Sequence, residues 1–513
     1  MCAKTIMIQG TGSGVGKSIL VTALCRIFKQ DGYRVAPFKA QNMALNSGVT
    51  KDGKEMARAQ ITQAQACSIE PVVEMNPILI KPTSDIGAQI ILLGRPIGNM
   101  KAQEYHKYKP KLRKAVIESL DKLKSQYEIV VIEGAGSPAE INLKKHDLVN
   151  MNLARMADSP VILVADIDKG GAFAWIVGTL ELLSKQERKR IKGIIINKFR
   201  GDEKLLKPGI DFIEKRCKKP VLGIIPYFKD IKIAEEDSVK LELRIANCEL
   251  RIEKISIAVI HLPHISNFTD FDVLEKEKDV SLRYVQDGDA LGNPDLIIIP
   301  GTKNTIDDLW YLKETGLANQ IVSTPYSLLI GICGGYQMLG QEIQDPYGVE
   351  SSMGKIEGLG LLNIITTLEK DKTTFQIKAV LETDVFNINN LKIEGYEIHA
   401  GNTLLLENTR SLFRIVKRGG KKVDILDGVI SQDSKIMGTY IHGLFDNDSF
   451  RYALLNYLRD KKGLPSISKV DRFNAKQIKE KEYDKLANLV REKLDMKKIY
   501  RICNLGDRRY EKN

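Results

Sequence analysis

Two glycine-rich segments contain the residues whose types and spacing best support chemistry. The first, Gly10-Thr11-Gly12-Ser13-Gly14-Val15-Gly16-Lys17-Ser18, is a loop of the kind that cradles phosphate. Its glycines let backbone N–H groups converge on phosphate oxygens, and Lys17 can reach the terminal phosphates. The second, Gly331-Ile332-Cys333-Gly334-Gly335, places a cysteine on a sharp turn. The first segment predicts nucleotide binding, and the second predicts acyl transfer.

The phosphate loop lies between an expected strand and an expected helix. Residues 5–9 form an apolar run, and Ser18 opens a helical pattern whose N-terminus adds positive potential. In the strict GxxxxGK[ST] pattern Thr11 takes the position of the first glycine, and Gly10 precedes it. We expect the ATP phosphates to be bound by Thr11, Gly12, Gly14, Val15, Gly16, Lys17 and Ser18.

Further polar residues follow other expected strands and suit a magnesium-assisted phosphoryl transfer. Glu133 ends the apolar run 129–132, and carboxyl ends of parallel strands are where open α/β sheets carry their chemistry. We expect Ser18 and Glu133 to hold Mg²⁺. Lys39, after the run 34–38, is a candidate for stabilising charge on the transferring phosphoryl group. Asp166 and Asp168 also follow a strand and remain alternatives.

The cysteine turn has the layout of a nucleophile elbow. An apolar strand is expected over residues 327–332 and a helix begins after Cys333, so the turn exposes the sulfur and the helix N-terminus favours the thiolate. A thiolate nucleophile needs an imidazole partner. His442 follows a strand pattern and precedes a glycine, and His399 is its rival. The amides of Gly301 and Gly334 are expected to form the oxyanion hole.

The elements that position these residues alternate between strand and helix. Such alternation predicts parallel sheets covered on both faces, so the fold class is α/β. A charged stretch without core periodicity, at about 230–254, separates two such sets. We expect an ATP-binding domain over residues 1–235, a second α/β domain over 252–450 and a basic helical extension over 451–513.

Composition narrows the class of protein. The 513 residues carry a net charge of +12, but the extension alone holds 18 Lys/Arg and 9 Asp/Glu, which supplies +9. Its charges are mixed in sign, as on a solvated helix face, so we expect no nucleic acid partner. No apolar run reaches the roughly 18 residues that span a bilayer. Seven scattered cysteines without CxxC spacing, and a first strand that leaves no room for a signal peptide, predict a cytoplasmic protein.

Both sites resemble known families. The GTxxGVGKS loop, Lys39 and Val130-Val131-Ile132-Glu133-Gly134 resemble dethiobiotin-synthetase-type ligases, which phosphorylate a carboxy group with ATP and Mg²⁺. That resemblance implies that Asn197 reads the adenine, and Gly12 stands where ParA/MinD-type ATPases carry lysine. The Pro-Gly loop, the cysteine turn and the late His-Gly resemble class I glutamine amidotransferases. Many of those have glutamate two residues after the histidine; here Leu444 stands there, which leaves Glu397 and Asp446 as open alternatives for the third member.

The longer motifs resemble the cobyric acid synthase family. They are Lys39-Ala40-Gln41-Asn42-Met43-Ala44-Leu45-Asn46-Ser47, Asp166-Ile167-Asp168-Lys169-Gly170-Gly171, Asn267-Phe268-Thr269-Asp270 and Pro300-Gly301-Thr302-Lys303-Asn304-Thr305. The resemblance implies glutamine- and ATP-dependent amidation of the b, d, e and g carboxylates of adenosylcobyrinic acid a,c-diamide. It also implies corrinoid contacts at Gln41, Asn42 and Asn46. A cobyrinic acid a,c-diamide synthase, or a regulatory P-loop ATPase with a degenerate glutaminase domain, remains the alternative.

Overall fold

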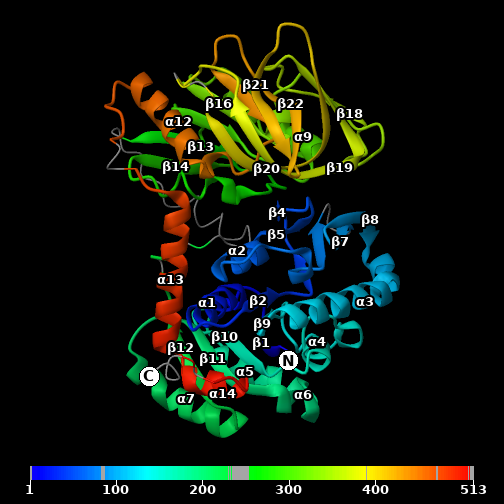
Figure 1. Cartoon of the computed structure of the whole chain (residues 1–513), viewed down its shortest axis with the longest axis vertical. Coiled ribbons are helices and arrows are strands. Elements are labelled where there is room, and N and C mark those ends of the chain that lie inside the picture. Colours follow the sequence, from blue (N-terminus) through cyan, green and yellow to red (C-terminus); the bar gives the residue numbers. More distant parts are fainter. Residues whose placement is uncertain are drawn as a thin grey trace.

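The computed structural model describes residues 3–82, 87–228, 230–231, 233, 254–386, 388, 390–468, 472–506 and 508. Figure 1 shows two lobes stacked along the long axis of the molecule, with one C-terminal helix running from the second lobe along the side of the first. Each lobe is built around its own sheet with helices packed on it. The predicted α/β class is therefore confirmed.

The first lobe contains a parallel sheet of six described strands in the order β12-β11-β10-β1-β9-β2. Its central strands are apolar runs buried on both faces, because helices cover both sides. The strands are β1 (Lys4–Gly10), β2 (Val35–Phe38), β9 (Ile129–Glu133), β10 (Val161–Asp166), β11 (Ile191–Phe199) and β12 (Val221–Pro226). The helices are α1 (Lys17–Gln30), α2 (Arg58–Ala66), α3 (Ala102–Gln126), α4 (Met151–Met156), α5 (Ala172–Leu182), α6 (Lys185–Arg190) and α7 (Glu203–Cys217).

An insertion between β2 and β9 faces the second lobe. It holds a four-stranded sheet of described strands in the order β3-β6-β7-β8 and a separate hairpin of β4 and β5. In Figure 1 the hairpin lies at the top of the first lobe, and β4 contacts the long strand β20 of the second. The elements are β3 (Gln41–Met43), β4 (Ser47–Val49), β5 (Glu55–Ala57), η1 (Val73–Met75), β6 (Ile78–Pro82), β7 (Gly87–Leu92), β8 (Arg95–Lys101) and, after β9, η2 (Lys144–His146).

The second lobe joins a parallel core to a long antiparallel extension. The core order is β14-β13-β15-β16-β23, and β22, β21 and β19 continue the same sheet. The core strands are β13 (Ile255–Ile260), β14 (Val280–Val285), β15 (Leu296–Ile299), β16 (Leu328–Ile332) and β23 (Ile436–Thr439). The extension contains β17 (Glu342–Gln344), β18 (Lys355–Glu357), β19 (Ile364–Leu381), β20 (Lys392–Leu405), β21 (Arg410–Arg418) and β22 (Lys421–Ile430). The helical segments are η3 (Phe268–Phe271), α9 (Thr305–Glu314), α10 (Leu317–Ser323), α11 (Gly334–Met338), η4 (Leu444–Asp446) and α12 (Asp448–Lys461).

The C-terminal helices return to the first lobe. Helix α13 (Ala475–Lys493) lies along α1, and α14 (Met496–Ile502) follows it. The mixed charges predicted a solvated helix, but only one face of α13 fits that expectation. Its other face buries Tyr483, Leu486 and Val490 in the core of the first lobe, since these positions recur at helical spacing. No helix in the described ranges is both long and apolar enough to cross a membrane.

Candidate active sites

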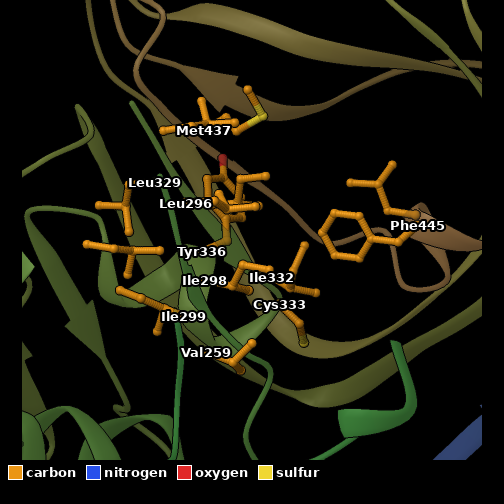
Figure 2. Close-up of a cluster of buried hydrophobic side chains, with 14 of the residues drawn as sticks. Val259, Leu296, Ile298, Ile299, Leu329, Ile332, Cys333, Tyr336, Met437 and Phe445 are labelled. Atoms are coloured by element: carbon orange, nitrogen blue, oxygen red, sulfur yellow. The ribbon is translucent and has the colours of Figure 1, made fainter. Parts of the chain in front are cut away.

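Cys333 sits on a strained turn between β16 and α11. Its φ of 53° and ψ of −109° lie in a region that costs a non-glycine residue about 1–3 kcal/mol. Figure 2 shows the residue at the edge of a cluster of buried side chains that includes Ile332 and Tyr336. Gly335 must be glycine, because a Cβ there would lie 2.0 Å from the carbonyl oxygen of Ile299. The packed sheet therefore holds the sulfur in a fixed place, where the carbonyl oxygen of Ile398 is 3.6 Å away.

His442 follows β23 and is held next to Cys333. Its Nδ1 lies 2.7 Å from Oδ2 of Asp270, and its ring stacks on Tyr396 with the centroids 5.3 Å apart. Burial disfavours the charged ring, but the charge and hydrogen bond of Asp270, followed by Cys333, raise the pKa of His442 to about 10. The arrangement thus stabilises an imidazolium beside the thiol, as a thiolate nucleophile requires.

Asp270 is a site residue that sequence reasoning missed. The two open alternatives have other partners: Glu397 pairs with Arg418 at 2.8 Å, and Asp446 pairs with Lys479 at 2.8 Å. Asp270 instead lies in η3, on the loop after β13, at the same sheet edge as Cys333. It is 172 residues from His442 in the chain, so the signal was its place in the Asn267-Phe268-Thr269-Asp270 motif after a buried strand.

The predicted oxyanion residues also lie at this site. A Cβ on Gly301 would be 3.2 Å from Cε1 of His442 and 3.6 Å from Cβ of Cys333. A Cβ on Gly334 would be 2.7 Å from Cγ2 of Thr302, so the two loops touch. The structure therefore brings Gly301, Gly334, Cys333 and His442 together.

The rival histidine, His399, belongs to the wall of a neighbouring cavity. Its Nδ1 lies 2.8 Å from the carbonyl oxygen of Gly401, and its ring stacks on Tyr440 at 3.7 Å. The cavity has a volume of about 730 Å³, and its lining includes Tyr336 from α11 and Asp427 from β22. Burial raises the pKa of Asp427 to about 7. The wall of the cavity is largely polar, and it includes Tyr336, three residues after Cys333, and Tyr440, two residues before His442.

The phosphate loop joins β1 to α1 in the first lobe. Lys17 donates from Nζ to the carbonyl oxygens of Gly12 at 2.8 Å and Gly136 at 3.2 Å. Asn197, from β11, donates to the carbonyl oxygen of Val15 at 2.8 Å. Asn197 thus lies beside the phosphate loop, close to where a nucleotide would bind. Thr11 begins the loop, and its N–H donates to Val164 of the adjacent strand β10.

Glu133, at the carboxyl end of β9, is the centre of a buried polar group beside the loop. Ser18 donates to its Oε1 at 2.7 Å, and Lys39 forms an ion pair with the same oxygen at 2.9 Å. Gln63 of α2, which sequence reasoning missed, donates to Oε2 at 2.6 Å. The predicted residues Ser18, Lys39 and Glu133 therefore converge.

The oxygen donors of Ser18 and Glu133 fit Mg²⁺. This ion commonly takes one or two protein oxygen ligands and completes its shell with phosphates and water. The described residues contain no cluster of three or more His, Cys, Asp or Glu that could hold a metal ion. The alternative acids are paired with cations: Asp166 with Lys198 and Asp168 with Arg200, each at 2.7 Å.

The three residues expected to contact a corrinoid differ in their surroundings. Gln41 is partly exposed and accepts a hydrogen bond from Tyr105. Asn42 is buried and donates to Gln60 at 2.9 Å. Asn46 is buried against the second lobe, where it accepts from the N–H of Phe268 at 3.1 Å. Gln41 alone is partly open to solvent, and Asn46 belongs to the contact between the lobes.

Comparisons with known proteins agree with this two-site organisation. The model of the CobQ/CobB/MinD/ParA nucleotide binding domain matches residues 6–241. The model of the CobB/CobQ-like glutamine amidotransferase domain matches residues 256–450. A glutamine amidotransferase from Thermotoga maritima aligns with 48% of this chain and 98% of its own at 17% identity, with a TM-score of 0.26, which is too low to support an inference.

Three full-length relatives are much more similar. The cobyric acid synthase of Thermoanaerobacter sp. (strain X514) is 52% identical over 98% of this chain and 99% of its own length. That of Pelotomaculum thermopropionicum is 52% identical over 98% and 97%, and that of Clostridium botulinum (strain ATCC 19397 / Type A) is 51% identical over 98% and 99%. With half of its residues shared along nearly the whole length, this chain belongs to the cobyric acid synthase family.

Proposed function

We propose that this protein uses ATP and glutamine to amidate the b, d, e and g side-chain carboxylates of adenosylcobyrinic acid a,c-diamide, which gives cobyric acid in cobalamin biosynthesis. The observation that carries the proposal is the presence, in one chain of this family, of a Cys333–His442–Asp270 arrangement and a phosphate loop beside Glu133. The first suits release of ammonia from glutamine, and the second suits activation of a carboxylate.

Glutamine hydrolysis takes place in the second lobe. The thiol of Cys333 transfers its proton to His442, and the thiolate attacks the side-chain carbonyl carbon of glutamine. The N–H groups of Gly301 and Gly334 stabilise the oxyanion. The C–N bond then breaks, His442 protonates the leaving nitrogen, and water hydrolyses the thioester to glutamate and free thiol. Asp270 holds the His442 ring and stabilises its charge throughout. The adjacent polar cavity, at about 730 Å³, has room for glutamine.

Carboxylate activation takes place in the first lobe. A corrinoid carboxylate oxygen attacks the γ-phosphorus of ATP, the bond to ADP breaks, and an acyl phosphate forms. Ammonia then displaces phosphate, and the amide results. Lys17 and Lys39 lie where they can balance charge on the phosphoryl group. Mg²⁺, held by Ser18 and Glu133, would add neutralisation of phosphate charge there. Gln41 is proposed to contact the corrinoid.

One experiment tests both glutamine hydrolysis and carboxylate activation. Purified protein is given ATP, Mg²⁺ and adenosylcobyrinic a,c-diamide with either glutamine or an ammonium salt, and mass spectrometry counts the amides formed. We expect four successive amidations with both nitrogen sources, and amidation only from ammonium in the Cys333→Ser variant. Amidation of cobyrinic acid itself, with no turnover of the a,c-diamide, would assign the protein to the a,c-diamide synthase reaction instead. Hydrolysis of ATP without any amide would refute the ligase.

A further inference from the structure

The loop that carries Asp270 is held by the other lobe. The side chain of Asn46 accepts a hydrogen bond from the N–H of Phe268 at 3.1 Å. In return, the side chain of Asn267 accepts from the N–H of Ser47 at 3.0 Å. These residues are buried, so water does not compete for the two bonds. The reciprocal pair fixes the start of η3, two residues before the carboxylate that contacts His442.

The same segment of the first lobe supports the other side of the histidine. The hydroxyl of Tyr396 donates to the carbonyl oxygen of Ser47 at 3.4 Å, and the Tyr396 ring stacks on His442. The backbones of Tyr396 and His442 also exchange hydrogen bonds of 3.2 and 2.9 Å. His442 is therefore held between Asp270 and Tyr396. The loop of Asp270 is bonded to Asn46 and Ser47, and Tyr396 is bonded to Ser47.

A buried group of ion pairs holds the segment of Asn46 and Ser47 in place. Glu55 pairs with Lys81 of its own lobe at 2.6 Å and with Lys372 of the second lobe at 2.9 Å. The hydroxyl of Ser47 donates to Glu55 at 2.9 Å and accepts from Lys81 at 2.7 Å. Because these groups are out of water, their mutual geometry is strongly determined. The contact between the lobes is thus a buried network of ion pairs and hydrogen bonds that reaches the loop of Asp270.

We propose that Asn46, together with Asn267, is a positioning residue for glutamine hydrolysis, which holds Asp270 against His442 only while the two lobes are docked. The inference rests on the proposed glutaminase function of the second lobe. It gives Asn46 a role different from the corrinoid contact that the resemblance implies. Its consequence is that ammonia is released by a site whose alignment depends on the domain that consumes it.

The expected fall in the rate of glutamine hydrolysis follows from the geometry of proton transfer. Displacing a catalytic group by about 1 Å can cost on the order of 100-fold in rate. Loss of one of two supporting bonds would displace Asp270 by less than that, so we expect a roughly ten-fold fall in kcat for glutamine hydrolysis. The KM for glutamine is expected to change little, because Asn46 does not line the cavity next to the cysteine turn.

Two variants and a matched control test the proposal in the full-length protein. Asn46→Ala removes one acceptor. Asn267→Gly removes the other while keeping the left-handed backbone that Asn267 adopts at φ 54°. Thr374→Val is the control, since Thr374 also donates across the lobes, to Gly53 at 2.7 Å, but touches neither Asp270 nor Tyr396 in the described contacts. Glutamate release and ammonium-driven amidation are measured for each, with Cys333→Ser as the reference that separates failure of the glutaminase assignment from failure of this inference.

The expected result is a kcat for glutamate release that falls about ten-fold in Asn46→Ala and in Asn267→Gly but not in Thr374→Val, with ammonium-driven amidation kept in Asn267→Gly and Thr374→Val. The pH profile supplies a second readout. Burial lowers and Asp270 raises the pKa of His442, so a misplaced Asp270 moves the alkaline limb of glutamine hydrolysis to lower pH. The proposal is overturned by an unchanged kcat and pH profile in both variants, or by an equal loss in Thr374→Val.

Discussion

Replacing Asp270 by asparagine removes the carboxylate that pairs with His442 while keeping the size of the side chain. The pKa of His442 rises from 6.5 to about 10, against the effect of burial, because of Asp270 and then Cys333. At about 1.36 kcal/mol per unit, that shift corresponds to about 5 kcal/mol in favour of the imidazolium. A charge-assisted hydrogen bond accounts for about 1.5–3 kcal/mol of such a preference. Taking about 3 kcal/mol for Asp270, we expect glutamate release to fall on the order of 100-fold.

Two assays check this expectation. Glutamate release at neutral pH should fall as stated, while amidation driven by ammonium is retained, because the phosphate loop lies in the other lobe. Thermal unfolding adds a signed test. The folded pKa of His442 is raised, so the stability that the pair contributes is present in full below about pH 6.5 and is lost as pH rises through about 10. The difference in stability between wild type and Asp270→Asn should follow that window. Glutamate release within a few-fold of wild type would refute the assigned role of Asp270.

Three further changes have expected outcomes. Lys17→Ala should abolish amidation from glutamine and from ammonium alike, as product analysis would detect, because both nitrogen sources need the activated carboxylate. Asp427→Asn should stabilise the protein at pH 8, by no more than about 4 kcal/mol, and not at pH 4, because burial raises the pKa of Asp427 to about 7 and stability falls as pH rises from about 4 to 7. Leu486→Ala should lower the free energy of unfolding by about 2–5 kcal/mol in denaturant titrations, since this fully buried side chain joins α13 to the first lobe.

For each of these three predictions, a specific experimental result would contradict the reasoning. Amide formation from ammonium by Lys17→Ala would remove the phosphate loop from the mechanism. Equal stability changes at both pH values in Asp427→Asn would mean that packing, and not ionisation, decides its effect. For Leu486→Ala the control is Lys481→Ala on the exposed side of the same helix, expected within about 0.5 kcal/mol of wild type. A comparable loss in both would show that the helix itself, and not its buried face, had been damaged.

Much of the fold was predictable because parallel strands that are buried on both faces occur in the sequence as unbroken apolar runs. The runs before the phosphate loop and before Cys333 became β1 and β16 for this reason. The insertion between β2 and β9 was not predicted, because β3, β4 and β5 are only three residues long and β8 is mostly exposed, so these strands carry little periodic signal. The buried face of α13 was missed because charge dominates its composition, and only the packing against α1 shows which residues it covers.

The sequence by itself determined the chemistry at each site, because glycine loops and nucleophile turns are local: Lys17, Ser18 and Cys333 are positioned by the strand and helix on either side of them. Only the tertiary structure decided which distant residues complete those sites. Asp270 reaches His442, and Gln63 reaches Glu133, because strand order brings loops far apart in the chain to one sheet edge. The same holds for Asn46, which the sequence placed near a substrate. Its contact with Phe268 depends on how the lobes dock, and no local pattern encodes a contact whose two halves are 222 residues apart.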